Sequence, residues 1–125
     1  MAGARVVIVD DNPINLKLAR LILDAEGYLI ETANSAEQAL AVLEGFAPAL
    51  ILMDVQLPGM DGLSLVRKLR HDGRSSETKI VAFTAYAMQG DEAKALAAGC
   101  DGYVTKPIHP DALLEVVAGL LASTR

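Results

Sequence analysis

The sequence predicts an α/β protein built on one doubly wound, five-stranded parallel sheet, and two observations carry that prediction. First, short apolar runs bounded by turn signals alternate with segments of helical periodicity, which is typical of strands buried on both faces of a parallel sheet. Second, four of these runs end in polar groups, namely Asp10-Asp11, Asp54, Thr84 and Lys106. Because parallel strands share one direction, these groups are expected to meet at one edge of the sheet, where open α/β folds bind ligands.

Strand and helix patterns alternate five times, and no repeat, linker or low-complexity stretch interrupts them. The 125 residues are therefore expected to form one domain, 1–125, that is large enough to bury its own core. The expected strands are 5–9, 29–32, 49–53, 79–83 and 102–105. The expected helices are 13–26, 36–44, 62–72, 90–98 and 110–122.

The first helix has clear start and stop signals. Asn12 is a good N-cap, and Pro13 suits the first helical position because proline has no N–H to leave unsatisfied there. Gly27 stops the helix. Its apolar stripe is predicted to consist of Leu18, Leu21, Ile22 and Ala25.

The later helices carry signals of the same kind. Ser35 and Gln38 form a capping box ahead of Leu40 and Leu43. Asp61 is the natural cap of the third helix. The apolar face of the last helix is predicted to consist of Leu113, Leu114, Val117, Leu120 and Leu121.

The fourth helix differs from the others in how little it can bury. Between Gly90 and Gly99 the only large apolar residue is Leu96, and the rest are alanine and polar or charged residues. Apolar burial contributes about 25 cal/mol per Å², so this helix is predicted to pack weakly. Weakly packed elements are the ones that move when a ligand binds.

Composition excludes several classes of function. The net charge of −5 is unlike the basic footprint of a nucleic-acid-binding domain, and no segment has the length or composition of a signal peptide or a membrane span. The cations between 67 and 79 are interpreted as a solvated helix face, with a docking patch for an acidic partner as the alternative. The single cysteine, Cys100, suits a reducing compartment and is predicted to be a small buried hydrophobe, so we expect a cytoplasmic protein.

The polar strand ends form a candidate site for a metal and a phosphoryl group. Carboxylates and water are the ligands that Mg²⁺ prefers, whereas Cys100, His71 and His109 lack the spacing of a zinc site. The sequence contains no phosphate-binding glycine-rich loop and no G-x-S-x-G elbow. What remains is a carboxylate nucleophile, Asp54, beside a metal and a cation, and positioning with charge neutralisation is what phosphoryl transfer needs.

These residues occur in a recognisable order and spacing. They are Asp10-Asp11, Asp54, Leu57-Pro58-Gly59-Met60-Asp61-Gly62, Thr84-Ala85 and Lys106-Pro107. Over essentially its whole length the chain resembles a response-regulator receiver domain of two-component signalling, of the kind found in hybrid histidine kinases and single-domain regulators. The resemblance implies a flavodoxin-like (βα)5 fold with strand order 2-1-3-4-5.

The resemblance also implies a role for each site residue. Asp54 would be the phosphoacceptor that attacks a phosphohistidine. Asp11, Asp54 and the backbone carbonyl of Gln56 would bind Mg²⁺ directly, and Asp10 would bind it through water. Lys106 would pair with the phosphoryl oxygens.

Further roles follow from the same resemblance. Thr84 and Tyr103 would be the switch hydroxyl and the switch aromatic residue, and the Lys106–Pro107 bond would be cis. Gln56 and Tyr86 would set the rate at which water removes the phosphoryl group. The phosphoryl donor would be a histidine kinase or a histidine phosphotransfer protein. The face formed by the fourth helix, fifth strand and fifth helix would report phosphorylation and is a candidate for self-association.

Two other classes of function fit the sequence less well. A pseudo-receiver that binds partners without phosphorylation need not keep its acids and lysine, and this chain has the full set. A metal-dependent phosphatase with an aspartyl nucleophile needs a second acid two residues later, where this chain has Gln56. We therefore expect a signalling module that is not an enzyme toward outside substrates. The starting Met1 and the short 123–125 tail favour a stand-alone regulator over an excised domain.

Overall fold

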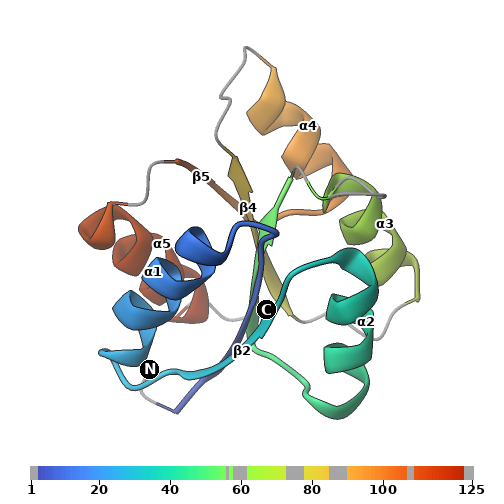
Figure 1. Cartoon of the computed structure of the whole chain (residues 1–125). Coiled ribbons are helices and arrows are strands. Elements are labelled where there is room, and N and C mark those ends of the chain that lie inside the picture. Colours follow the sequence, from blue (N-terminus) through green and yellow to red (C-terminus); the bar gives the residue numbers. More distant parts are fainter. Residues whose placement is uncertain are drawn as a thin grey trace.

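A computed structural model describes residues 3–55, 57, 62–72, 78–84, 90–106 and 109–122. A central sheet is covered by α1 and α5 on one face and by α2, α3 and α4 on the other (Figure 1). The strands are β1 (Arg5–Val9), β2 (Leu29–Ala33), β3 (Leu50–Asp54), β4 (Lys79–Thr84) and β5 (Gly102–Thr105). All four pairings are parallel, and the order β2-β1-β3-β4-β5 is the one that the resemblance implied.

The helices begin and end close to their predicted bounds. They are α1 (Pro13–Asp24), α2 (Ala36–Gly45), α3 (Gly62–Asp72), α4 (Asp91–Ala98) and α5 (Pro110–Ala122). The largest difference is at the end of α1, which stops two residues earlier than predicted, with Ala25 as its C-cap. In the described part of the chain, no helix is long and apolar enough to cross a membrane.

The core has two halves, one on each face of the sheet. Strand β3 is buried along its whole length, and β1 and β4 are buried except at their first residue. This burial on both faces explains why these strands are continuous apolar runs in the sequence. The edge strand β2 is more exposed, and its Leu29 is 52% exposed.

The predicted apolar face of α1 is partly wrong. Ala19 and Leu23 are the buried residues of this helix, whereas Leu18, Leu21 and Ala25 are exposed. Of the four predicted residues, only Ile22 packs against the core. Apolar residues cover more than half of this helix, so periodicity fits more than one face. The small side chain of Ala19 is fully buried in the core on this face of the sheet.

The predicted caps are present where the structure describes them. Asn12 Oδ1 accepts hydrogen bonds from the N–H groups of Ile14 (2.9 Å) and Asn15 (3.3 Å). Ser35 Oγ accepts the Gln38 N–H at 3.1 Å, but Gln38 reaches back to the N–H of Asn34 rather than to that of Ser35. The predicted cap Asp61 lies outside the described residues. All five predicted residues of the α5 face pack against the core.

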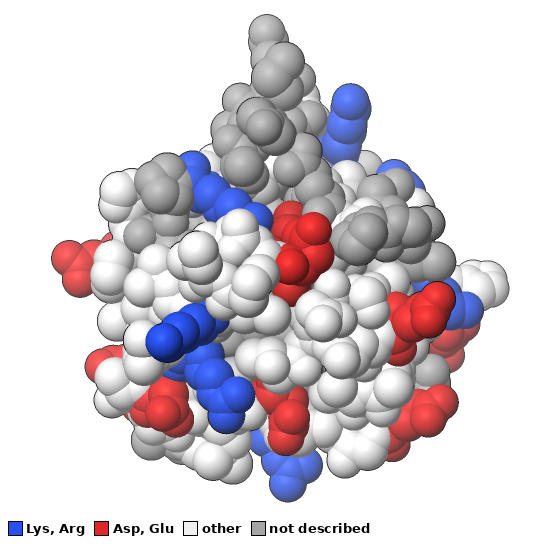
Figure 2. All heavy atoms as spheres, viewed as in Figure 1, with Lys and Arg blue, Asp and Glu red and all other residues white. Residues whose placement is uncertain are grey.

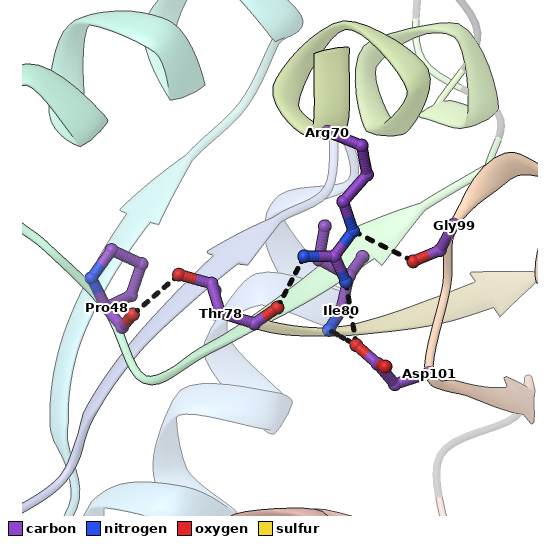
Figure 3. A network of polar contacts seen from close by, with 6 residues as sticks. All are labelled: Pro48, Arg70, Thr78, Ile80, Gly99 and Asp101. Atoms are coloured by element: carbon purple, nitrogen blue, oxygen red, sulfur yellow. Dashed lines mark hydrogen bonds and ion pairs between the residues drawn. The ribbon is translucent and has the colours of Figure 1, made fainter. Parts of the chain in front are cut away.

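Arg70 joins three segments at the amino edge of the sheet (Figure 3). From α3 it donates hydrogen bonds to the carbonyls of Gly99 (3.0 Å) and Thr78 (2.8 Å) and to Asp101 Oδ2 (2.7 Å). The same Asp101 oxygen accepts the N–H of Ile80 at 2.9 Å. Gly99 has a φ of +116°, and a Cβ there would lie 2.8 Å from Arg70 Cγ, so glycine is required on both counts.

The packing of α4 agrees with the weak packing predicted for it. Among its side chains at 92–98, Ala95 and Ala98 are buried, and Leu96 is 50% exposed. The helix therefore buries little apolar surface. Its carboxyl end nevertheless adjoins the Arg70 contacts through Gly99.

Candidate functional site

The polar strand ends meet at the carboxyl edge of the sheet, as the sequence predicts for parallel strands. Carboxylate oxygens of Asp10, Asp11 and Asp54 all lie within 4.8 Å of one another. Lys106 Nζ lies 3.1 Å from Asp10 Oδ2 and 3.3 Å from Asp54 Oδ2. Thr84, the last residue of β4, is buried at the same edge.

Strand register explains why these side chains converge. Asp54 pairs with Phe83 of β4, which in turn pairs with Val104 of β5. Paired residues in a parallel sheet point to the same face, and side chains alternate along each strand. By this alternation Asp54 shares the α1 and α5 face with Phe83, and Lys106, two residues after Val104, begins above the same face.

The site holds three carboxylates and one described ammonium group. Asp10 and Asp54 are 1% and 2% exposed, whereas Asp11 is exposed. Asp10 Oδ2 is buried and has no hydrogen-bond partner among the described residues, so its compensation is the ion pair with Lys106. Buried carboxylates this close repel one another unless cations compensate their charge. One lysine compensates one charge, so the donor set fits a divalent cation with oxygen ligands.

A pocket of about 640 Å³ opens beside these groups. In Figure 2 a compact acidic group lies near the middle of the face, where β1 passes into α1 in Figure 1. Asp11, Asp54 and Lys106 are accessible from the pocket, whereas Asp10 is buried and is not part of its lining. Its full lining is Asp11, Asn12, Pro13, Ile14, Asn15, Asp54 and Lys106.

Two residues contribute to the site that the sequence analysis did not single out for it. Gly62 begins α3 directly against the acceptor strand, because a Cβ there would overlap the Asp54 carbonyl and lie 2.8 Å from Val55 Cα. Phe83 lies beneath the Lys106 ammonium, with Nζ 5.1 Å from the ring centroid. Gly62 stands within the quoted motif, but no local pattern marks Phe83, which looks like an ordinary strand residue.

Other predicted site residues are placed only in part. Tyr103 of β5 packs against the half of the core under α2, α3 and α4, and its hydroxyl oxygen is shielded from solvent. The residue predicted to be the switch aromatic therefore lies against the core in this structure. Gln56, Tyr86 and the Lys106–Pro107 bond lie outside the described residues.

Comparison with known proteins places these features in a family. Residues 6–118 match the model of the response regulator receiver domain. The polar-differentiation response regulator DivK of Brucella anthropi is 40% identical over 117 residues, covering 93% of this chain and 94% of the relative. The DivK protein of Brucella ovis is 38% identical over 116 residues, with the same shares covered.

Solved structures agree with this match. A CheY-like receiver domain protein from Methanospirillum hungatei is 37% identical, with a TM-score of 0.86, over 96% of this chain and 94% of that one. The receiver domain of the sensor histidine kinase PA1611 from Pseudomonas aeruginosa is 33% identical, with a TM-score of 0.88, over 98% of this chain and 100% of that one. That structure has a magnesium ion in its active-site cleft. The chain belongs to the response regulator receiver family, the phosphoacceptor modules of two-component signalling.

Proposed function

We propose that Asp54 is the residue that accepts the phosphoryl group, and that the donor is a phosphohistidine. A carboxylate oxygen of Asp54 would attack phosphorus while the phosphorus–nitrogen bond breaks. The nitrogen leaves with the electron pair, and Asp54 becomes an acyl phosphate. The observation that supports this most is the position of Asp54 in the pocket, with Lys106 Nζ 3.3 Å away. Lys106 would then pair with the transferred phosphoryl oxygens.

Asp11 and Asp54 would hold Mg²⁺, with the backbone carbonyl of Gln56, and Asp10 would act through water. The clustered carboxylate oxygens and the magnesium ion in the similar receiver of PA1611 support this set. When bound, the ion would neutralise charge on the acceptor and on the transferred group. Asp11 is the exposed member of the set, so it would face the ion most directly.

The proposed chemistry is limited to accepting the phosphoryl group and losing it slowly to water. The described part of the site offers no carboxylate other than the three already assigned. Gln56 and Tyr86, which the resemblance assigns to this step, would orient and cover the attacking water. This chain would therefore act as a signalling module rather than as an enzyme on outside substrates.

The surface beside the pocket supports a histidine kinase or a histidine phosphotransfer protein as the donor. On α1, Ile14, Leu18 and Leu21 are 74%, 39% and 59% exposed and follow one another at helical spacing. Ile14 also lines the pocket. A partner packed on these side chains would bring its phosphohistidine to the mouth of the pocket, and a small phosphoryl donor would not need them.

The face that would report phosphorylation is formed by α4, β5 and α5. A groove of about 300 Å³ lies between β5 and α5, and Tyr103 contributes to its lining. A movement of Tyr103 would therefore change a surface available to a partner or to a second copy of the chain.

The acceptor can be tested by treating the protein with acetyl phosphate and Mg²⁺ and measuring its intact mass. The wild-type protein should gain one phosphoryl group, and Asp54→Asn should gain none because the amide is not a nucleophile. Asp72→Asn is a matched control, since Asp72 is exposed at the end of α3. A phosphoryl group gained by Asp54→Asn would contradict the assignment.

The donor surface can be tested with Leu21→Asp, which lies outside the pocket lining. This variant should be phosphorylated by acetyl phosphate at the wild-type rate. Transfer from a phosphorylated histidine phosphotransfer domain should fall by about tenfold or more, because a charge replaces an apolar contact. Equal rates from the protein donor would show that the partner does not use this face.

A further inference from the structure

Lys106 has to reach across a strand to contact Asp54. Asp54 ends β3, Lys106 follows β5, and β4 lies between these two strands. Neighbouring strands are about 4.8 Å apart, so β3 and β5 are separated by roughly 10 Å, which the side chains of Lys106 and Asp54 bridge together. The residue of β4 that pairs in register with Asp54 is Phe83. The lysine side chain therefore crosses the β4 position that Phe83 occupies.

The ring of Phe83 contacts the ammonium at the end of that path. Lys106 Nζ lies 5.1 Å from the ring centroid, within the range of a cation–π contact. Phe83 is 1% exposed, and its backbone lies in a strand that pairs with β3 on one side and with β5 on the other. Lys106 itself has 14% of its side chain exposed, so water screens the contact only in part.

We propose that Phe83 is a positioning residue for phosphoryl transfer, whose ring face holds the Lys106 ammonium between Asp10 and Asp54. The inference rests on the proposed function of Asp54 and Lys106. A lysine side chain is flexible and loses rotamer freedom when it is held in one place. The ring adds a third attraction to those of the two carboxylates.

An aromatic ring suits this task better than a further acid. A third carboxylate partner would compete with the phosphoryl group for the ammonium and would add to the repulsion within the site. A ring is neutral and takes no metal, so it holds Lys106 before and after Asp54 changes its charge. A leucine would fill similar space without attracting the cation.

The first test measures the contact itself by NMR. Protons above an aromatic face are shifted upfield by the ring current, so the Lys106 ε-methylene protons should be upfield of those of an exposed lysine such as Lys17. The shift should disappear in Phe83→Leu. An ordinary shift in the wild-type protein would overturn the proposal, whatever the activity of the variants.

The second test changes the ring's charge distribution and leaves its shape nearly intact. Fluorinated phenylalanines with one, two and three fluorines weaken the attraction of the ring face for a cation in that order. The chain has two phenylalanines, and Phe46 also lies under a cation, with Arg5 5.4 Å from its centroid. Arg5 begins β1 at the opposite edge of the sheet, so Phe46 is a matched control.

Phosphorylation by acetyl phosphate should slow stepwise with fluorination at Phe83, to about tenfold for the trifluorinated ring. The same replacement at Phe46 should leave the rate unchanged. Equal effects at both positions, or no effect at Phe83 while thermal stability is preserved, would overturn the proposal. If the wild-type protein takes no phosphoryl group at all, the proposed function fails, while the NMR result still decides the contact.

Discussion

Asp10 and Asp11 are neighbours in the sequence, but their carboxylates have different surroundings. Asp10 is buried, with Oδ1 accepting the Asn12 N–H at 2.9 Å and Oδ2 paired with Lys106. Asp11 is exposed and lines the pocket. The two oxygens of Asp10 are therefore engaged by the protein, whereas those of Asp11 face the pocket. A metal in this pocket would depend more on Asp11.

Removing each acid in turn tests this division. Asp11→Ala should abolish Mg²⁺ binding more completely than Asp10→Ala, because Asp11 would be a direct ligand and Asp10 would act through water. Isothermal titration of Mg²⁺ into the two variants and the wild-type protein measures the difference. Equal losses of affinity would contradict the division of roles.

At the scale of the element, α3 contributes to stability through Arg70. Its guanidinium donates to three acceptors on the segments before β4 and β5, and 19% of the side chain is exposed. A lysine keeps the charge but cannot reproduce this fork of donors. We therefore expect Arg70→Lys to weaken mainly the contact between α3 and the α4–β5 connection.

Arg70→Lys should lower the free energy of unfolding by about 1–3 kcal/mol, because buried acceptors lose their donors. Urea denaturation measures this change. Arg67→Lys on the same helix is the control, and it should change stability by less than about 0.5 kcal/mol because Arg67 is exposed. A loss no larger in Arg70→Lys than in Arg67→Lys would show that the lysine satisfies the same acceptors.

The elements themselves could be predicted because their ends carry chemical signals. Asn12 before Pro13, the Ser35 cap and the polar strand ends are all local features. The buried face of α1 could not be predicted, since several apolar faces compete and only packing selects Ala19. The Arg70–Asp101 pair joins residues 31 apart, so no local pattern marks it. Phe83 was missed for the same reason.

At the scale of the whole molecule, Cys100 makes stability depend on pH in the alkaline range. Burial, partly offset by Arg70 and reinforced by Asp101, raises the pKa of the Cys100 thiol from 9.0 to about 11. The folded state therefore holds this proton more tightly than the unfolded state. The stabilisation is fully present below about pH 9 and is lost as the pH rises toward 11. The free energy of unfolding that is lost over this pH range amounts to roughly 2–3 kcal/mol.

Comparison of the wild-type protein with Cys100→Ala should show this effect. The free energy of unfolding should fall more steeply between pH 9 and 11 in the wild-type protein than in the variant. Tyr28, whose pKa is raised by burial and then by Glu26, is present in both proteins, so it does not account for the difference. Parallel pH profiles would show that the thiol is not protected from solvent in solution.

The contact between Arg70 and Gly99 gives α4 one fixed end. Eight helical residues span about 12 Å, so a rotation of roughly 10° about Gly99 would move the Gly90 end by about 2 Å. The helix would then pivot about its Gly99 end at the amino edge of the sheet, and its Gly90 end would move the most. A partner bound at the Gly90 end would therefore experience the whole displacement of about 2 Å. A partner bound at the Gly99 end would experience almost no displacement.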